Sequence, residues 1–257
     1  MCSIIYGPVP SWRLGRSLGI DLLSTQEKTC SFDCIYCQLG RTAQPLTERK
    51  EFVTIPTLVS ELEQAKGVPA DYATFSGVGE PTLASNLGRA IERAKSILGL
   101  PVAVLTNSSL MPEEEVRQEL ARADVVVAKL DAPNEELFRT VNRPAIGYSL
   151  DRILQGLKRF RSEYKGKLAL QMMFVKENKD CASQMAKVAA ELSPDEVQIN
   201  TPLRPCGVKP LLPEEIADVK QAFSSFERVI TAYEATRPDV RPLDLEGTLR
   251  RRPKESS

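Results

Sequence analysis

Apolar runs alternate with amphipathic segments from about residue 16 to residue 223, and this alternation constrains the fold more than any other feature. Several of the runs are rich in Val, Ile or Leu and apolar nearly throughout, which is typical of parallel strands buried on both faces. The predicted strands are SLGIDLL (17–23), DYATFSG (71–77), PVAVLTN (101–107), DVVVAKLD (124–131), LALQMMFV (168–175) and EVQINTPL (196–203).

Segments of helical periodicity lie between these strands, and several have recognisable ends. Gly99, shortly before Pro101, predicts the end of one helix, and Pro112 followed by acidic residues predicts the start of another. The predicted helices lie within residues 57–66, 83–99, 111–123, 149–166, 180–192 and 212–226. Six strands each followed by a helix predict an α/β fold with right-handed crossovers, either an open doubly wound sheet or an incomplete barrel.

The chain shows no internal repeat and no low-complexity linker, and its 257 residues suffice for one large α/β domain. The segment TRPDVRPLDLEGTLRRRPKESS at the end is rich in proline and charge. We therefore expect a domain over residues 1–225, including an N-terminal lead-in, and a C-terminal extension over 226–257. About the last ten residues of that extension are expected to be mobile.

Composition excludes several classes of function. The 34 basic and 34 acidic residues balance, which argues against whole-surface attraction to nucleic acid or anionic lipid but allows a local basic patch. The N-terminus lacks the apolar core of a signal peptide, and no apolar run approaches the ~20 residues of a membrane span. We therefore expect a cytoplasmic protein with no membrane partner, where clustered cysteines are metal-binding or catalytic. The chain has no histidine, so the commonest general base and zinc ligand are missing.

The segment KTCSFDCIYCQLG (28–40) places Cys30, Cys34 and Cys37 in a C-x3-C-x2-C spacing. This loop follows the first predicted strand, so it lies at the strand ends where α/β folds bind ligands. Thiolates favour zinc, copper(I) or iron–sulfur clusters. A 4Fe–4S cluster held by only three cysteines keeps one iron open, as a catalytic metal site requires.

Three further cysteines leave an alternative, a structural zinc site with four thiolates. Its fourth ligand would be Cys2, Cys181 or Cys206, but no second C-x2-C pair supports it. The same three cysteines are too few and too scattered for a second four-cysteine cluster. As isolated residues they are interpreted as buried apolar side chains or incidental thiols.

With Tyr36 at the aromatic position, the C-x3-C-x-aromatic-C motif resembles that of the radical S-adenosylmethionine (SAM) superfamily. The resemblance implies a (β/α)6 partial TIM barrel with a 4Fe–4S cluster on Cys30, Cys34 and Cys37, whose open iron is chelated by SAM. It further implies an external electron donor of the flavodoxin or ferredoxin type. The reduced cluster cleaves SAM to methionine and a 5′-deoxyadenosyl radical, which abstracts hydrogen from a substrate. Because the cofactor supplies the difficult chemistry, the lack of histidine is no handicap.

Other strand ends agree with this resemblance. FSGVGEPT (75–82) resembles the superfamily's G-G-E-P motif in a G-x-G-E-P variant, which assigns Gly77, Gly79 and Glu80 to the amino group of SAM; an ordinary strand-to-helix turn is the alternative. In LTNSSL, Asn107 is the first candidate for a ligand contact, although Thr106 and Ser108 share its capping chemistry.

Lys129 and Asp131 end the fourth predicted strand, and charges at the mouth of a buried strand must be paired, solvated or functional. The resemblance places one of them near the ribose or carboxylate of SAM, and an ion pair is the alternative. Gln171 and Asn200 are weaker candidates for the same cavity. The predicted SAM contacts are Tyr36, Gly77, Gly79, Glu80, Asn107, Lys129 and Asp131.

The lead-in resembles that of a family of compact radical SAM proteins with a G-P-V-P-S-x-R-L-G start. Arg13 and Arg16 are predicted to reach the strand ends and bind an anion, with a structural arm carrying two solvated arginines as the alternative. The position of Trp12 is more often basic in that family, which predicts that one phosphate- or carboxylate-binding charge is missing here.

That family is often grouped with the wyosine-base synthases, which suggests tRNA base modification as one reaction. The basic segments 159–167 and 248–254 are then the candidate RNA-binding surfaces. A second possibility is a glycyl-radical activating enzyme that acts on a partner protein. A third, without catalysis, is an iron–sulfur electron carrier or sensor. No residue in the sequence decides the substrate.

Overall fold

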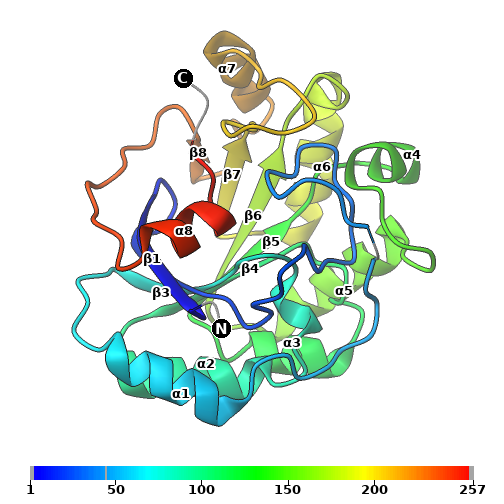
Figure 1. The fold of residues 1–257 in the computed structure, drawn as a ribbon. Helices are drawn as coiled ribbons and strands as arrows, with labels where there is room; N and C mark the ends of the chain where they lie inside the picture. Colours follow the sequence, from blue (N-terminus) through cyan, green and yellow to red (C-terminus); the bar gives the residue numbers. More distant parts are fainter. Residues whose placement is uncertain (1–2, 44, 255–257) are drawn as a thin grey trace.

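The computed structural model describes residues 3–43 and 45–254. Their strands form one curved sheet in the order β1-β2-β3-β4-β5-β6-β7-β8, with helices on its outer face (Figure 1). All neighbouring strands from β2 to β8 are parallel, and β1 is antiparallel to β2. The strands are β1 (Ile5–Ser11), β2 (Gly15–Ile20), β3 (Tyr72–Phe75), β4 (Val102–Thr106), β5 (Val125–Lys129), β6 (Lys167–Met173), β7 (Glu196–Asn200) and β8 (Val229–Thr231).

The six predicted strands correspond to β2–β7, and the predicted α/β partial barrel is confirmed. The predicted helices are also found, and Gly99 ends one of them in the left-handed conformation with φ of 64°. The helices are α1 (Ile55–Gln64), η1 (Pro81–Leu83), α2 (Leu87–Leu98), α3 (Glu114–Leu120), α4 (Glu135–Leu137), η2 (Phe138–Asn142), α5 (Leu150–Glu163), η3 (Lys179–Cys181), α6 (Ala182–Leu192), α7 (Pro213–Gln221) and α8 (Leu245–Arg251).

The two edge strands were not predicted. The lead-in forms β1, which contains two prolines and pairs on one side with β2. Proline lacks a backbone donor, so it is tolerated at a sheet edge and argues against a strand only in the sheet interior. Strand β8 has three residues and lies in the region expected to be an extension. The sheet therefore has eight strands, which are the six of the predicted (β/α)6 unit and one more at each edge.

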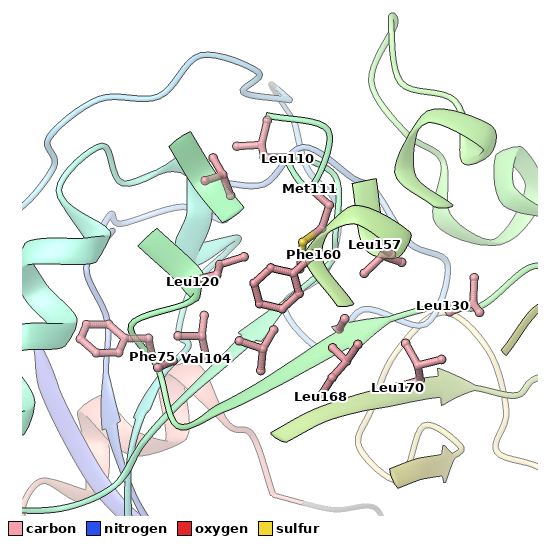
Figure 2. Close-up of a cluster of buried hydrophobic side chains, with 14 of the residues drawn as sticks. Phe75, Val104, Leu110, Met111, Leu120, Leu130, Leu157, Phe160, Leu168 and Leu170 are labelled. Carbon is pink, nitrogen blue, oxygen red and sulfur yellow. The ribbon is translucent and has the colours of Figure 1, made fainter. Parts of the chain in front are cut away.

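The main core lies between the sheet and its helices. Figure 2 shows Phe75, Val104, Leu120, Phe160, Leu168 and Leu170 in this layer. Each large apolar side chain that is fully buried contributes roughly 1.5–3 kcal/mol. Successive strand residues face opposite sides of a sheet. Between Leu168 and Leu170, Ala169 belongs instead to a second cluster with Val125, Val127 and Leu14, a residue of the β1–β2 turn. This second cluster lies on the inner face, where the site is built.

The last part of the chain returns from β8 to place α8 beside β1 (Figure 1). Arg251 of α8 forms an ion pair with Asp21 at 2.7 Å, and both side chains are 1% exposed. Residues 248–251, the first part of the segment expected to be mobile, therefore belong to a packed helix, and residues 255–257 lie outside the described part of the chain. Among the described residues, no helix combines the length and apolar character needed to cross a bilayer.

Candidate functional site

Cys30, Cys34 and Cys37 lie in the loop that follows β2, and all three are free thiols. The amide of Cys37 donates to the carbonyl of Cys34 at 3.1 Å, which closes a turn around the last two. Burial raises the pKa of the Cys30 thiol to about 12, and burial with the nearby Asp131 raises that of Cys34 to about 11. Ligation to a metal requires the deprotonated thiolate of each cysteine.

The cysteine loop is hydrogen-bonded to the G-x-G-E-P turn after β3. Thr29 donates its amide to the Val78 carbonyl at 3.0 Å, and its carbonyl accepts from the amide of Glu80 at 3.1 Å. A Cβ at Gly79 would lie 1.5 Å from the Thr29 carbonyl oxygen, so only glycine permits this approach. The structure thus brings the two predicted motifs side by side.

Glu80 is 2% exposed and lies across the ends of β3 and β4. Its carboxylate accepts hydrogen bonds from the hydroxyls of Thr82 and Thr106, both at 2.7 Å, and from the amide of Asn107 at 2.6 Å. Burial raises the pKa of Glu80, although these donors oppose the shift. Such a carboxylate fixes the relative position of two strand ends.

Two asparagine side chains point their amide groups at the cysteines. Asn107 Nδ2 lies 3.5 Å from Cys30 Sγ, and Asn142 Nδ2 lies 3.6 Å from Cys34 Sγ. Hydrogen bonds to cluster sulfurs help to set the reduction potential in iron–sulfur proteins. Asn107 was a predicted site residue. Asn142 was missed, because it lies 108 positions from Cys34 and only the return of the chain through η2 brings it there.

Tyr36 and Asp131 form a buried network with Asn142. The Tyr36 hydroxyl donates to Asp131, and Asn142 Nδ2 donates to the same carboxylate at 2.7 Å. The second oxygen of Asp131 accepts from the Met173 amide at 2.7 Å. Burial raises the pKa of Tyr36, so its hydroxyl remains a donor. Both oxygens of Asp131 therefore have partners within the protein.

Lys129 lies above Tyr36, with Nζ 4.8 Å from the ring centroid. It also lies 3.7 Å from Asp131, so the ion pair considered as an alternative is present. Its Nζ donates to Gln171 Oε1 at 2.7 Å, which leaves Gln171 Nε2 buried with no hydrogen-bond acceptor.

A cavity of about 240 Å³ opens beside this network. The predicted residues Tyr36, Gly77, Gln171 and Asn200 line it together with Cys37. The other five predicted SAM contacts are not among its lining residues: Gly79, Glu80, Asn107, Lys129 and Asp131. Their contact with SAM stays a prediction.

Of the two lead-in arginines, Arg13 lines this cavity. Arg16 does not reach it, and that prediction is wrong. Arg16 pairs with Asp71 at 2.7 Å, where β2 and β3 begin rather than where they end. Arg13 and Arg16 thus belong to the same hairpin but lie in different surroundings.

Of the remaining cysteines, one packs beside the loop, one lies elsewhere and one cannot be described. Cys2 is outside the described residues, Cys181 precedes α6, and Cys206 packs in an apolar cluster with Tyr36 and Val141. Among the described residues, no group of three or more His, Cys, Asp or Glu side chains is spaced to hold a single metal ion.

Residues 28–189 match the model of the Radical SAM superfamily. A UPF0026 protein of Methanocaldococcus jannaschii is 37% identical over 235 residues, an alignment that covers 89% of this chain and 72% of that protein. A UPF0026 protein of Synechocystis is 40% identical over 208 residues, covering 80% of this chain and 77% of that protein.

Solved structures show the same fold at low sequence identity. The structure of native anSMEcpe with bound AdoMet matches with a TM-score of 0.64 and 18% identity, over 84% of this chain and 64% of that chain. Streptococcus suis SuiB matches with a TM-score of 0.62 and 14% identity, over 85% of this chain and 49% of that one. The chain thus spans about half the length of SuiB and slightly under two thirds of anSMEcpe.

Proposed function

The chain belongs to the radical SAM superfamily and, within it, to the family of UPF0026 proteins, and from this premise we propose that Cys30, Cys34 and Cys37 hold its 4Fe–4S cluster. The protein is a radical SAM enzyme that uses this cluster and SAM. When bound, they supply reductive cleavage of SAM to methionine and a 5′-deoxyadenosyl radical that takes hydrogen from the substrate.

One observation carries the assignment: two amide groups converge on the cysteine sulfurs. Asn107 follows β4 and Asn142 ends η2, and each is also held by a second hydrogen bond, to Ser31 and Asp131 respectively. Fixed donors at 3.5–3.6 Å from sulfur suit thiolates that carry cluster charge.

We assign the SAM site to the residues around the cysteine loop. Tyr36 and Gly77 line the cavity and are proposed to contact SAM directly. Glu80 is the acceptor proposed for the amino group of SAM, since it is a buried carboxylate whose charge acts on Cys30. Gly79 precedes Glu80, and Asn107 donates its amide to the Glu80 carboxylate. Lys129 lies over the Tyr36 ring, and Asp131 accepts a hydrogen bond from the Tyr36 hydroxyl.

Radical SAM enzymes need a reductant. An external donor of the flavodoxin or ferredoxin type is the proposed source of the electron. None of the five cysteines that the structure describes forms a disulfide. This supports the proposal that the protein works in the reducing cytoplasm.

For the final reaction, tRNA base modification of the wyosine-synthase kind remains a proposal. The basic segment 159–167 gives it little support, because Arg161 pairs with Asp195 and Lys167 pairs with Glu196. The segment 248–254 supports it better, since Arg252 lines the cavity beside the cysteine loop. Activation of a glycyl-radical partner protein is the other candidate.

Anaerobic reconstitution tests the cluster assignment. We expect about four irons per chain, as for one 4Fe–4S cluster, and loss of most iron in Cys34→Ala. Cys181→Ala is the matched control and keeps its iron. Dithionite and SAM should then release 5′-deoxyadenosine from the wild type. Equal iron retention by both variants contradicts the assignment, and dependence of turnover on added tRNA separates RNA modification from activation of a partner protein.

A further inference from the structure

Five arginines line the cavity that Tyr36 and Cys37 border. They come from distant parts of the chain: the turn between β1 and β2, the loop after β7, and the segment after β8. Among the lining residues that the structure describes, none is Asp or Glu. The arginines are Arg13, Arg204, Arg237, Arg251 and Arg252.

One of the five has a structural role. Arg251 donates to Asp21 at 2.7 Å, to the Ser3 carbonyl at 2.8 Å and to the Gly247 carbonyl at 3.1 Å. Its charge is compensated by Asp21, and its side chain ties α8 to the start of the chain. The anion-binding argument therefore concerns the other four.

These four arginines line one cavity. Burial of Arg13 and the charges of Arg252, Arg204 and Arg237 lower its pKa to about 9, and the charge of Glu196 opposes this shift. Its guanidinium lies 4.9 Å from the centre of the Trp12 ring, while its Nε is buried with no hydrogen-bond acceptor. The other three arginines also engage other groups of the protein, so the argument rests on their charge and position and on Arg13.

Arginines from three segments of the chain line one cavity in which no described lining residue is acidic, and such a lining suits an anion. A carboxylate has two oxygens and is satisfied by one bidentate arginine. A phosphate group carries about −1.5 to −2 charge and three acceptor oxygens, and arginine forks match its geometry. The number of arginines thus favours phosphate over carboxylate.

We infer that this cavity binds a phosphate or diphosphate group of the substrate, held by Arg13, Arg204, Arg237 and Arg252. This inference rests on the proposed function, because the same cavity is bordered by Cys37 and Tyr36 of the cluster loop. Gln171 supplies the cavity with an unpartnered donor, its Nε2, for a neutral acceptor of the same ligand. The residue is 7% exposed. The C-terminal extension then serves substrate binding, since it contributes Arg237 and Arg252.

Pyrophosphate is the probe, titrated calorimetrically into anaerobically reconstituted protein with SAM present, at about 0.15 M salt. We expect saturable binding that Arg13→Gln weakens by at least about 10-fold, equivalent to about 1.4 kcal/mol. Arg16→Gln is the matched control from the same hairpin and should bind like the wild type. Arg204→Gln tests a second segment should Arg13→Gln fold poorly, and melting temperature and iron content are measured for every variant.

Competition identifies the source of the phosphate. Displacement of pyrophosphate by a short RNA more strongly than by a nucleoside 5′-monophosphate supports a polynucleotide substrate, and the reverse supports a small phosphorylated molecule. Absence of pyrophosphate binding, or equal weakening by Arg13→Gln and Arg16→Gln, overturns the inference. So does a loss of SAM affinity in Arg13→Gln with pyrophosphate binding intact. A wild type that binds pyrophosphate but no iron contradicts the proposed function instead.

Discussion

Asn107 and Asn142 act on the cysteines through single N–H groups, so their effect belongs to the residue scale. A hydrogen bond to a sulfur ligand stabilises the more negative, reduced cluster more than the oxidised one. Removing it therefore lowers the reduction potential. For a one-electron couple, each ~1.4 kcal/mol of such preference corresponds to about 59 mV.

We predict that Asn107→Ala makes the cluster potential more negative by up to about 59 mV, the equivalent of one such hydrogen bond. A redox titration followed by electron paramagnetic resonance measures the shift. Asn134→Ala, which removes an asparagine that caps α4, is the matched control and leaves the potential unchanged. An unaltered potential in Asn107→Ala, with iron content intact, contradicts the role assigned to its side chain.

Residue chemistry could be predicted where it is local in the sequence and not where the fold assembles it. The spacing of Cys30, Cys34 and Cys37 and the G-x-G-E-P turn are each contained within eight residues. Asn142 carries no such signal, because its neighbours Tyr36 and Cys34 lie more than 100 positions away. Of the five arginines that line the cavity, Arg13 was predicted from the sequence as an anion ligand, and the segment 248–254 was predicted as a basic surface. That they would meet was not predicted, because this depends on how the loop after β7 and the C-terminal segment fold back.

At the scale of elements, the position of the cysteine loop depends on its contact with the turn after β3. Gly79→Ala places a methyl group where the Thr29 carbonyl oxygen lies, so loop and turn must separate. We predict loss of most bound iron, together with destabilisation of about 1–3 kcal/mol, as for overpacked sites. Iron per chain and urea unfolding measure the two effects.

Gly99→Ala is the control for that substitution. Gly99 has φ of 64°, and a Cβ there would meet nothing within 4 Å. Alanine at Gly99 therefore strains the backbone by roughly 1 kcal/mol without moving the cysteine loop. Full iron retention in Gly99→Ala with loss in Gly79→Ala separates the steric effect from general instability. Similar iron content in both variants would show that the contact does not position the loop.

The elements that sequence patterns predicted share one property: their apolar periodicity is long enough to be recognised. Strands β2–β7 are buried and regular, and several of their helices begin or end with proline, acids or glycine. Strand β1 was hidden by its prolines, and β8 by its length of three residues. Their pairing is determined by the sheet edges that receive them, which local patterns do not encode.

At the scale of the whole molecule, the C-terminal segment joins the two edges of the sheet. It leaves β8 at one edge and ends in α8, which packs against β1 at the other (Figure 1). Gly7 donates its amide to the Thr248 hydroxyl at 3.0 Å, and the Arg251–Asp21 pair lies next to this contact. Residues from both parts of the chain, among them Arg13, Arg237 and Arg252, line the cavity proposed to bind phosphate. Substrate binding and the attachment of α8 are therefore coupled.

This coupling predicts a large effect for Arg251→Met. The substitution leaves Asp21 buried without its counter-charge, and breaking a buried pair in this way costs about 3–5 kcal/mol. Because the amides of Leu23 and Ser24 also donate to Asp21, we expect the lower end of this range, measured by urea unfolding.

Arg122→Met removes a half-exposed pair with Glu92 and serves as the control, with a loss of at most about 1 kcal/mol. The double variant Asp21→Asn/Arg251→Met should recover part of the loss, since no unpaired charge remains. A double variant as unstable as the sum of its singles would show that the two side chains stabilise the fold independently, and the ion pair would then not be what attaches α8.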